Sequence, residues 1–152
     1  MHAFMRQVSV TYRCAMLYRE KQLAETGLAG CQTPYLVALY RMPGISQEEL
    51  ARYLNVNKSS VARQLASLEK KGYVRREASP CDRRIQLVFP TQKAEDIKDR
   101  LFEVLFGWSE YLTADFSPEE KQQLLSMMRR VADRAEAYVK GGCDACEPSE
   151  NT

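Results

Sequence analysis

Two short helical segments separated by a turn constrain the fold of this chain more than any other feature. The sequence SQEELARYLNV places Ser46 and Glu49 at the spacing of a capping box, which predicts that a helix begins there. Asn57 is expected to cap the second segment, KSSVARQLASLEKKG, and Gly72 to end it. Two short helices joined by so short a turn are typical of a helix-turn-helix.

Two strand-like segments, YVRRE and IQLVF, follow directly and are joined by a charged turn. Ser79, Pro80 and Asp82 are turn-forming residues, so a β-hairpin is expected. A helix-turn-helix followed by such a hairpin is a winged helix. The predicted fold is therefore mainly α-helical, with a small β-hairpin as its wing.

Longer helices are expected on both sides of this core. One covers residues 4–26, and a short apolar helix follows with Thr33 as its N-cap and Pro34 at its first position. A long helix is predicted to run without a break from a cap at Thr91 to about Leu112.

The last helix carries the clearest start signal in the chain. Ser117 is its predicted N-cap, Pro118 its first residue, and Glu120 completes a capping box. Together with the preceding helix it carries more apolar side chains than a winged helix of roughly 60 residues can cover, among them Phe102, Phe106, Trp108, Leu124 and Leu125. A second, interlocked copy of the chain would bury them. A larger monomeric core is the alternative.

Basic residues are concentrated in the middle of the chain. The net charge is +2, but the segment from Arg52 to Arg84 holds nine Lys or Arg and three acids, a net charge of +6. The remainder of the chain is therefore −4. A local basic segment in an otherwise acidic chain predicts one face that binds a polyanion.

The second helix of the helix-turn-helix has an exposed face suited to DNA. Opposite its apolar stripe lie small hydroxyls, an arginine and a glutamine, which can approach a groove closely and bind guanine or adenine edges. The amides at its N-terminus favour a phosphate beside Asn57, Lys58 and Ser59. Surface polarity alone is the alternative reading. The candidate DNA contacts of this helix are Asn57, Lys58, Ser59, Ser60, Arg63 and Gln64.

The wing carries Arg83 and Arg84 at its tip, which a hairpin does not need in order to turn. Arginine is favoured in a narrow minor groove, where the negative potential is enhanced. Asp82 is expected to orient Arg84 through a charge-assisted hydrogen bond before DNA binds. A solvated charged turn is the alternative interpretation.

These motifs together resemble the core of the MarR family of bacterial regulators. The resemblance rests on Leu50-Ala51, on Val56 and Val61 across the turn, on Leu68-Glu69 before Gly72-Tyr73-Val74, and on Asp82-Arg83-Arg84. It implies a homodimer on a pseudo-palindromic double-stranded operator, Arg84 in the minor groove, and repression relieved by a ligand or by oxidation. The sequence FPT at residues 89–91, where the family often has Leu-Thr, is a departure.

The domain organisation follows from this resemblance and from the apolar outer helices. Residues 31–90 are expected to form the DNA-binding winged helix, 1–30 and 91–140 the dimerisation helices, and 141–152 a flexible tail. A small apolar or phenolic effector would enter a crevice between them, lined by Tyr12, Tyr18, Tyr35, Tyr40 and Trp108. Core and interface packing is the alternative role for each of these side chains.

Cys14 offers a second way to release DNA. The sequence CAMLYR resembles the organic-hydroperoxide sensors of this family, which have a reactive cysteine in the first helix and a tyrosine four residues later, as Tyr18 is. Only Tyr35 matches the further tyrosines of those sensors, so the resemblance is partial. Reactivity requires a lowered thiol pKa, for which Arg13 and Arg19 are the available cations.

The composition argues against several other classes of protein. Five cysteines, an odd number, in a chain without an export signal predict reduced thiols and a cytoplasmic protein. Cys143 and Cys146 form the one Cys-x-x-Cys, but with a single histidine no zinc site is expected there. No apolar run is long enough for a membrane span. No motif indicates a cofactor or an enzyme, and a winged helix that binds proteins remains the alternative to DNA binding.

Overall fold

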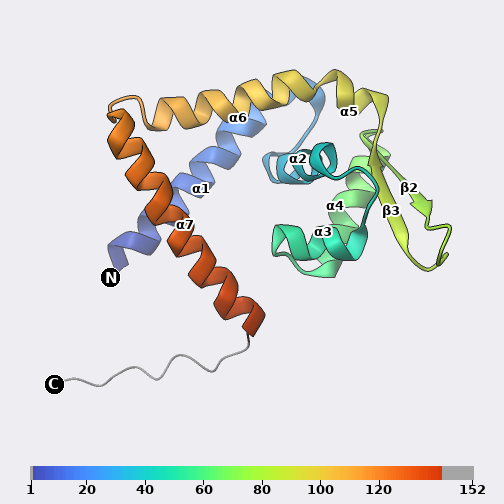
Figure 1. Ribbon diagram of the computed structural model, residues 1–152. Helices are drawn as coiled ribbons and strands as arrows, with labels where there is room; N and C mark the ends of the chain where they lie inside the picture. The colour runs from blue at the N-terminus through green and yellow to red at the C-terminus, as the bar shows by residue number, and fades with distance from the viewer. Residues whose placement is uncertain (1, 142–152) are drawn as a thin grey trace. The chain divides into compact units, whose positions relative to one another are not determined.

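The computed structural model describes residues 2–141 of the 152. Its strands and helices follow one another in the order shown in Figure 1: α1 His2–Gln22, α2 Thr33–Arg41, β1 Ile45–Ser46, α3 Gln47–Leu54, α4 Lys58–Lys70, β2 Val74–Ala78, β3 Gln86–Pro90, α5 Gln92–Asp96, α6 Lys98–Leu112 and α7 Pro118–Gly141. One compact unit reaches Tyr111, and a second begins at Leu112. None of the described helices combines the length and the apolar character that a membrane span requires.

The helix-turn-helix begins and ends at the predicted residues. Ser46 Oγ accepts a hydrogen bond from the Glu49 amide at 3.2 Å, and Glu49 Oε2 accepts one from the Ser46 amide at 3.0 Å. The turn after α3 passes through Asn55, whose positive φ of 52° suits asparagine better than most residues. Asn57 Oδ1 accepts a hydrogen bond from the Ser60 amide at 2.7 Å and so caps α4.

The core of the first unit is built around the inner stripe of α4. Val61, Leu65 and Leu68 have no exposed surface. They belong to one apolar cluster with residues of α2, α3 and the sheet, including Leu36, Leu39, Leu50, Tyr73 and Val88. Because the stripe is buried, the opposite face of α4 is fixed toward the outside of the molecule.

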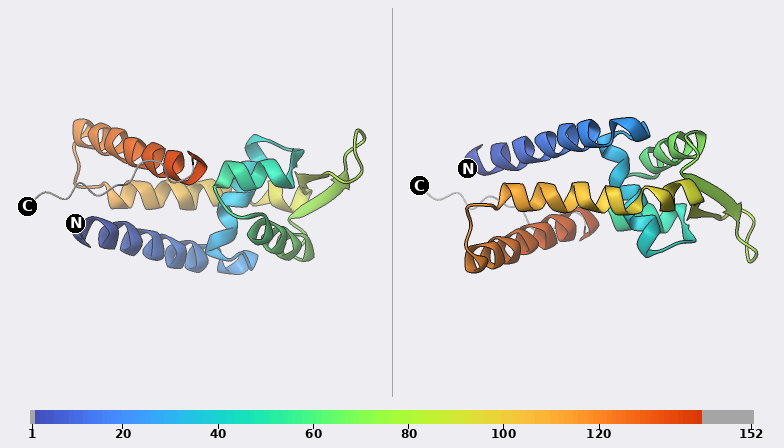
Figure 2. Two further views of the ribbon diagram at one scale, coloured as in Figure 1. Left: turned by 90° about the horizontal axis from the view of Figure 1, so that it is seen from below. Right: turned by 90° about the horizontal axis from the view of Figure 1, so that it is seen from above.

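The wing is the hairpin of β2 and β3, residues 74–90, and a short third strand extends its sheet. The strands are antiparallel in the order β1-β3-β2, and Arg76 lies opposite Val88. In both views of Figure 2 the hairpin projects beyond α3 and α4. Strand β1 was not expected, because its two residues, which pair with Val88 and Leu87, are too few to form a sequence pattern.

The prediction of one unbroken helix from Thr91 to Leu112 is wrong. Thr91 does cap α5, since its hydroxyl accepts a hydrogen bond from the Ala94 amide at 3.4 Å. The helix then breaks at Ile97, and α6 begins at Lys98. The hydroxyl of Tyr40, in α2, donates a hydrogen bond to the Ala94 carbonyl oxygen at 2.5 Å. A side chain that bonds into the helical ladder in this way is a recognised cause of a break.

The connection between α1 and α2 also differs from the prediction. Helix α1 ends at Gln22, and two 3₁₀ turns, Ala24–Thr26 and Gly30–Gln32, lead to α2. Gln32, rather than Thr33, is the N-cap residue of α2. At Gly30 a Cβ atom would lie 2.5 Å from the Met16 carbonyl oxygen. Glycine at this position therefore lets the connection pass directly against α1.

Candidate nucleic-acid interface

The exposed face of α4 holds the predicted DNA contacts. Ser59 and Arg63 are exposed and Ser60 is half-buried. Asn57 uses its carbonyl oxygen within the helix start, where it also accepts a hydrogen bond from Ser59 Oγ at 2.8 Å. Its role in the structure is therefore the cap that fixes where α4 begins. Arg63 is the exposed cation in the middle of this helix.

Lys58, at the first position of α4, is paired with an acid of the preceding helix. Its Nζ lies 2.7 Å from Glu48 Oε1, and both side chains are largely exposed. The hydrogen bond from Lys58 lowers the pKa of the Glu48 carboxyl. An exposed pair of this kind is worth little in stability, so a phosphate can displace the carboxylate at small cost.

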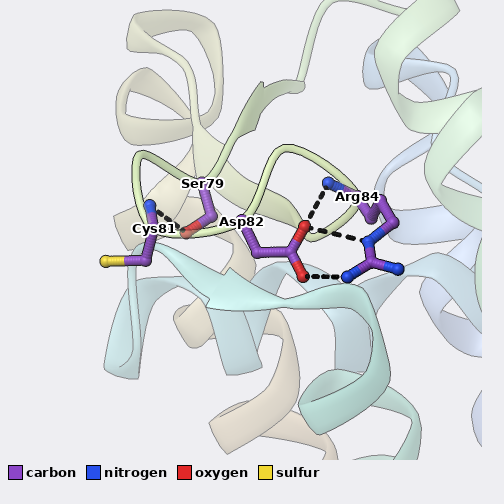
Figure 3. A network of polar contacts seen from close by, with 4 residues as sticks. All are labelled: Ser79, Cys81, Asp82 and Arg84. Atoms are coloured by element: carbon purple, nitrogen blue, oxygen red, sulfur yellow. Dashed lines mark hydrogen bonds and ion pairs between the residues drawn. The ribbon is translucent and has the colours of Figure 1, made fainter.

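The wing turn holds Arg84 in a defined orientation (Figure 3). The Asp82 carboxylate accepts hydrogen bonds from the Arg84 amide at 2.9 Å, from its Nε at 3.2 Å and from its Nη2 at 3.3 Å. These bonds, first the one from the amide, lower the pKa of Asp82. The Arg84 side chain is nevertheless 91% exposed. The guanidinium is thus oriented before it meets a partner, while its outer face is open.

Backbone hydrogen bonds close the same turn. The Ser79 amide donates to the Ile85 carbonyl oxygen at 2.8 Å, and the Ile85 amide donates to the Asp82 carbonyl oxygen at 2.9 Å. Arg83 is exposed at the tip. Lys58 and Arg84 line a common surface hollow between α3 and the wing. The start of α4 and the wing therefore face the same space.

Two contacts of the wing were not expected from the sequence. Arg76 of β2 donates hydrogen bonds from Nε, at 3.1 Å, and from Nη2 to Glu69 Oε2 of α4. The guanidinium of Arg75 lies 4.6 Å from the centre of the Phe89 ring. Arg76 therefore attaches the wing to α4, and Arg75 packs across the wing from β2 onto β3. The residue pattern of this short charged strand did not indicate either partner.

Gln64 lies at the edge of the α4 face rather than at its centre. It is half-buried, and its Oε1 accepts a hydrogen bond from Gln32 Nε2 at 3.3 Å. The sequence indicated a polar side chain facing the groove but not this internal partner.

Comparisons with known proteins agree with this geometry. A sequence model described as the MarR family matches residues 26–85. YwoH, an uncharacterized HTH-type transcriptional regulator of Bacillus subtilis, is 30% identical over 123 residues, which are 81% of this chain and 89% of YwoH. The chain belongs to the MarR family. YybA, a second such regulator of Bacillus subtilis, is 28% identical over 145 residues, 93% of this chain and 97% of its own.

Solved MarR structures share the fold. A crystal structure of MarR is 31% identical, with a TM-score of 0.78, over 86% of this chain and 89% of its own. A MarR regulator from Methanosarcina mazei is 28% identical, with a TM-score of 0.84, over 89% and 97%. A MarR-type protein from Listeria monocytogenes, in complex with 26mer DNA, is 23% identical, with a TM-score of 0.83, over 94% and 97%. The chain is a MarR-type transcriptional regulator with a winged-helix fold, as predicted.

The five aromatic residues predicted to line an effector crevice in this MarR-type chain do not form one group. Tyr18 and Trp108 stack with their ring centres 4.7 Å apart. Tyr40 points to Ala94 instead, and Tyr12 is 61% exposed. Tyr35 is buried. Burial raises its pKa, the nearby Cys31 adds to this rise, and Arg63 opposes it.

An apolar hollow does lie between α2 and α6, but none of these five side chains lines it. Its walls include Val37, Phe102, Leu105 and Phe106, with Arg41 and Asp99 as charged members. This hollow was not predicted from the sequence, because apolar residues such as Val37 and Leu105 have the same pattern whether they line a surface hollow or fill a core.

Three of the five cysteines lie in the described part of the chain. Cys14, Cys31 and Cys81 are free and exposed. Cys14 therefore has the access that a sensor requires. Cys143 and Cys146 lie outside the described residues. Within residues 2–141 no group of three or more His, Cys, Asp or Glu side chains is arranged to hold a metal ion.

Proposed function

We propose that the protein is a homodimeric repressor that binds a pseudo-palindromic double-stranded operator with α4 in the major groove and the wing in the minor groove. The observation that carries this proposal is the shared position of two basic side chains beside one hollow. Lys58, at the start of α4, and Arg84, in the wing, line the same hollow. One sugar-phosphate backbone running through that space would lie between the two grooves that α4 and the wing read.

Several features of the two elements support DNA rather than a protein as the partner. The exposed face of α4 carries Ser59 and Arg63 and no large apolar side chain. Arg84 is oriented by Asp82 and almost fully exposed, which suits insertion into a narrow minor groove. The Listeria relative was crystallised with 26mer DNA, and this chain shares its fold.

The homodimer is supported by apolar side chains left exposed in the single chain. Phe106 of α6 is 67% exposed, and no described residue of α7 is buried. Other large apolar groups with more than a third of their surface exposed lie on the same helices and on α1, among them Phe4, Met5, Leu17, Tyr111, Leu125, Met128 and Val131. Obligate interfaces bury surfaces of this composition.

Release of the operator is proposed to follow the binding of a small apolar or phenolic effector. The stacked pair of Tyr18, in α1, and Trp108, in α6, supports this mechanism, because a planar ligand that separated the rings would change the spacing of these helices. Thiol oxidation is the second candidate. It is favoured by the exposure of Cys14, four residues before Tyr18 on the same helix.

Fluorescence anisotropy tests the DNA proposal directly. The labelled probe is the DNA that flanks the protein's own gene, and its affinity is measured at several salt concentrations. Wild type should bind more tightly than it binds random DNA and lose affinity steeply with salt. Arg84→Ala should weaken binding and reduce the salt slope by about one per subunit, whereas Lys21→Ala, which removes a charge from α1, should not. Equal affinity of wild type for all sequences, with no salt dependence, contradicts the proposal.

A further inference from the structure

Gln32 is almost completely buried, with 2% of its surface exposed. All the hydrogen-bonding positions of its side-chain amide are occupied by groups of the protein. Its Oε1 accepts from the Ala29 amide at 3.1 Å and from Lys71 Nζ at 2.8 Å. Its Nε2 donates to Ser67 Oγ at 3.0 Å and to Gln64 Oε1 at 3.3 Å. A side-chain amide has two N–H donors and an oxygen with two lone pairs, so the group is fully satisfied.

The partners of Gln32 fix which end of its amide is which. The backbone amide of Ala29 and the ammonium of Lys71 can only donate, so the atom that faces them must be the oxygen. Lys71 is itself held by the Gly27 carbonyl oxygen at 2.6 Å. The NH₂ group of Gln32 must therefore face α4. Reversing the amide would place two donors against two donors inside a buried site, at the cost of unsatisfied buried polar groups.

The orientation of the Gln64 amide follows from that of Gln32. Because Gln32 presents an N–H group, Gln64 must present its own oxygen to it. The oxygen and nitrogen of an amide lie on opposite sides of the terminal carbon. The NH₂ group of Gln64 is consequently the end that is turned away from Gln32. This orientation was not visible in the sequence, since the two residues are 32 positions apart.

We propose that Gln32 determines base specificity by making Gln64 a donor-only reader. A glutamine that reads adenine bidentately must accept from N6 and donate to N7 at once. With its oxygen turned inward, Gln64 offers only donors to the groove, and guanine, with acceptors at O6 and N7, is the purine it fits. This inference rests on the proposed function, because it requires α4 to lie in the major groove.

The test is selection of bound half-sites from a random double-stranded DNA pool, followed by anisotropy on the selected site and on its guanine-to-adenine variant. Gln64→Ala first identifies the base pair that Gln64 reads, as the position at which preference is lost. Wild type should prefer guanine there by roughly tenfold. In Gln32→Glu, the carboxylate still accepts hydrogen bonds from Ala29 and Lys71. It has no N–H group to donate to the oxygen of Gln64, so it can only accept a hydrogen bond from the Gln64 NH₂ group. Gln64 must then reverse, and the preference should move to a base with an amino group in the groove, adenine or cytosine.

Gln32→Met serves as the second variant, since it keeps the length of the side chain and removes all four hydrogen bonds. It should relax the preference at that one position and leave the others unchanged. Retention of the full guanine preference in both Gln32 variants would overturn the inference, as would a Gln64→Ala protein that selects the wild-type site at every position. If wild type enriches no sequence at all, the proposed function itself fails, a result distinct from either of these.

Discussion

Glu69, near the end of α4, accepts two hydrogen bonds from the guanidinium of Arg76 in β2. The pair joins the helix proposed to read the major groove to the first strand of the wing. The hydrogen bond to Arg76 lowers the pKa of Glu69, and the same bond raises the pKa of Arg76. Both shifts agree that each group is charged in the folded protein.

Glu69→Gln should lower the stability of the protein slightly, by an amount that depends on pH. Glu69 is partly solvated, so we expect a loss of no more than about 1 kcal/mol in the free energy of unfolding. The lowered pKa means that this stabilisation is present above the ordinary value of 4.5 and is lost as the pH falls through the folded pKa below it. Thermal unfolding of both proteins between pH 7 and pH 3 measures this difference. A difference that stays constant with pH would contradict it.

Asp82→Asn should lower operator affinity without removing any positive charge. The asparagine oxygen can still accept from the Arg84 amide, but the charge-assisted bonds to the guanidinium are weakened. Arg84 then has to be ordered when DNA binds, and we expect a loss of a few-fold with an unchanged salt slope. Anisotropy over a salt series distinguishes this result from Arg84→Ala. Tighter binding by Asp82→Asn would show instead that the carboxylate acts mainly by repelling phosphate.

Tyr40→Phe should destabilise the protein through its single lost hydrogen bond. Burial raises the pKa of Tyr40 well above its usual range, so the hydroxyl remains a donor to the Ala94 carbonyl oxygen at neutral pH. The ring contact with Phe102 is kept. We expect about 1 kcal/mol of lost stability, a drop of a few degrees in Tm. Tyr53→Phe, whose hydroxyl is on the surface, is the matched control and should change Tm much less.

Leu125→Asp should convert the protein to a monomer. Leu125 is 69% exposed in the single chain, where a carboxylate would stay in water, but burying a carboxylate in an apolar interface is strongly unfavourable. Light scattering after gel filtration measures the mass, and Gln123→Asp on the same helix is the control. A Leu125→Asp protein with the mass of the wild type would remove α7 from the proposed interface.

Cys14→Ser distinguishes the two release mechanisms. If oxidation of Cys14 releases the operator, peroxide should lower the anisotropy of the wild-type complex and leave that of the variant unchanged. Phenolic compounds should act equally on both proteins, because serine keeps the size of the side chain. Peroxide-induced release that persists in Cys14→Ser would exclude Cys14 as the sensor.

Most local signals in this chain were read correctly because their causes are local, although the N-cap of α2 is Gln32 and not Thr33. The capping boxes of Ser46 with Glu49 and of Ser117 with Glu120 join residues three positions apart, and both are present. Asp82 orients a residue two positions away. Each of these contacts is fixed by the backbone of one turn, so the residue types at that spacing were sufficient to predict it.

The features that were missed depend on residues distant in the sequence. The hydrogen bond next to the break at Ile97 comes from Tyr40, which is 54 positions from the carbonyl it binds. The orientation of Gln64 depends on Gln32. The attachment of the wing to α4 depends on Glu69 and Arg76, which are seven positions apart on either side of the end of the helix. A single sequence shows that such side chains are polar or aromatic, but not which partner the fold brings to each.

The lack of any buried side chain among the described residues of α7 affects how the amount of active regulator depends on the amount of chain made. A helix without a buried side chain in its own chain gains little from folding alone. Folding and pairing of two chains would then be one reaction, second order in the chain. At low rates of synthesis most copies would remain unpaired and open to proteolysis. Operator occupancy would therefore rise with about the square of the amount of protein made, so that the gene responds to a threshold of its regulator as well as to an effector.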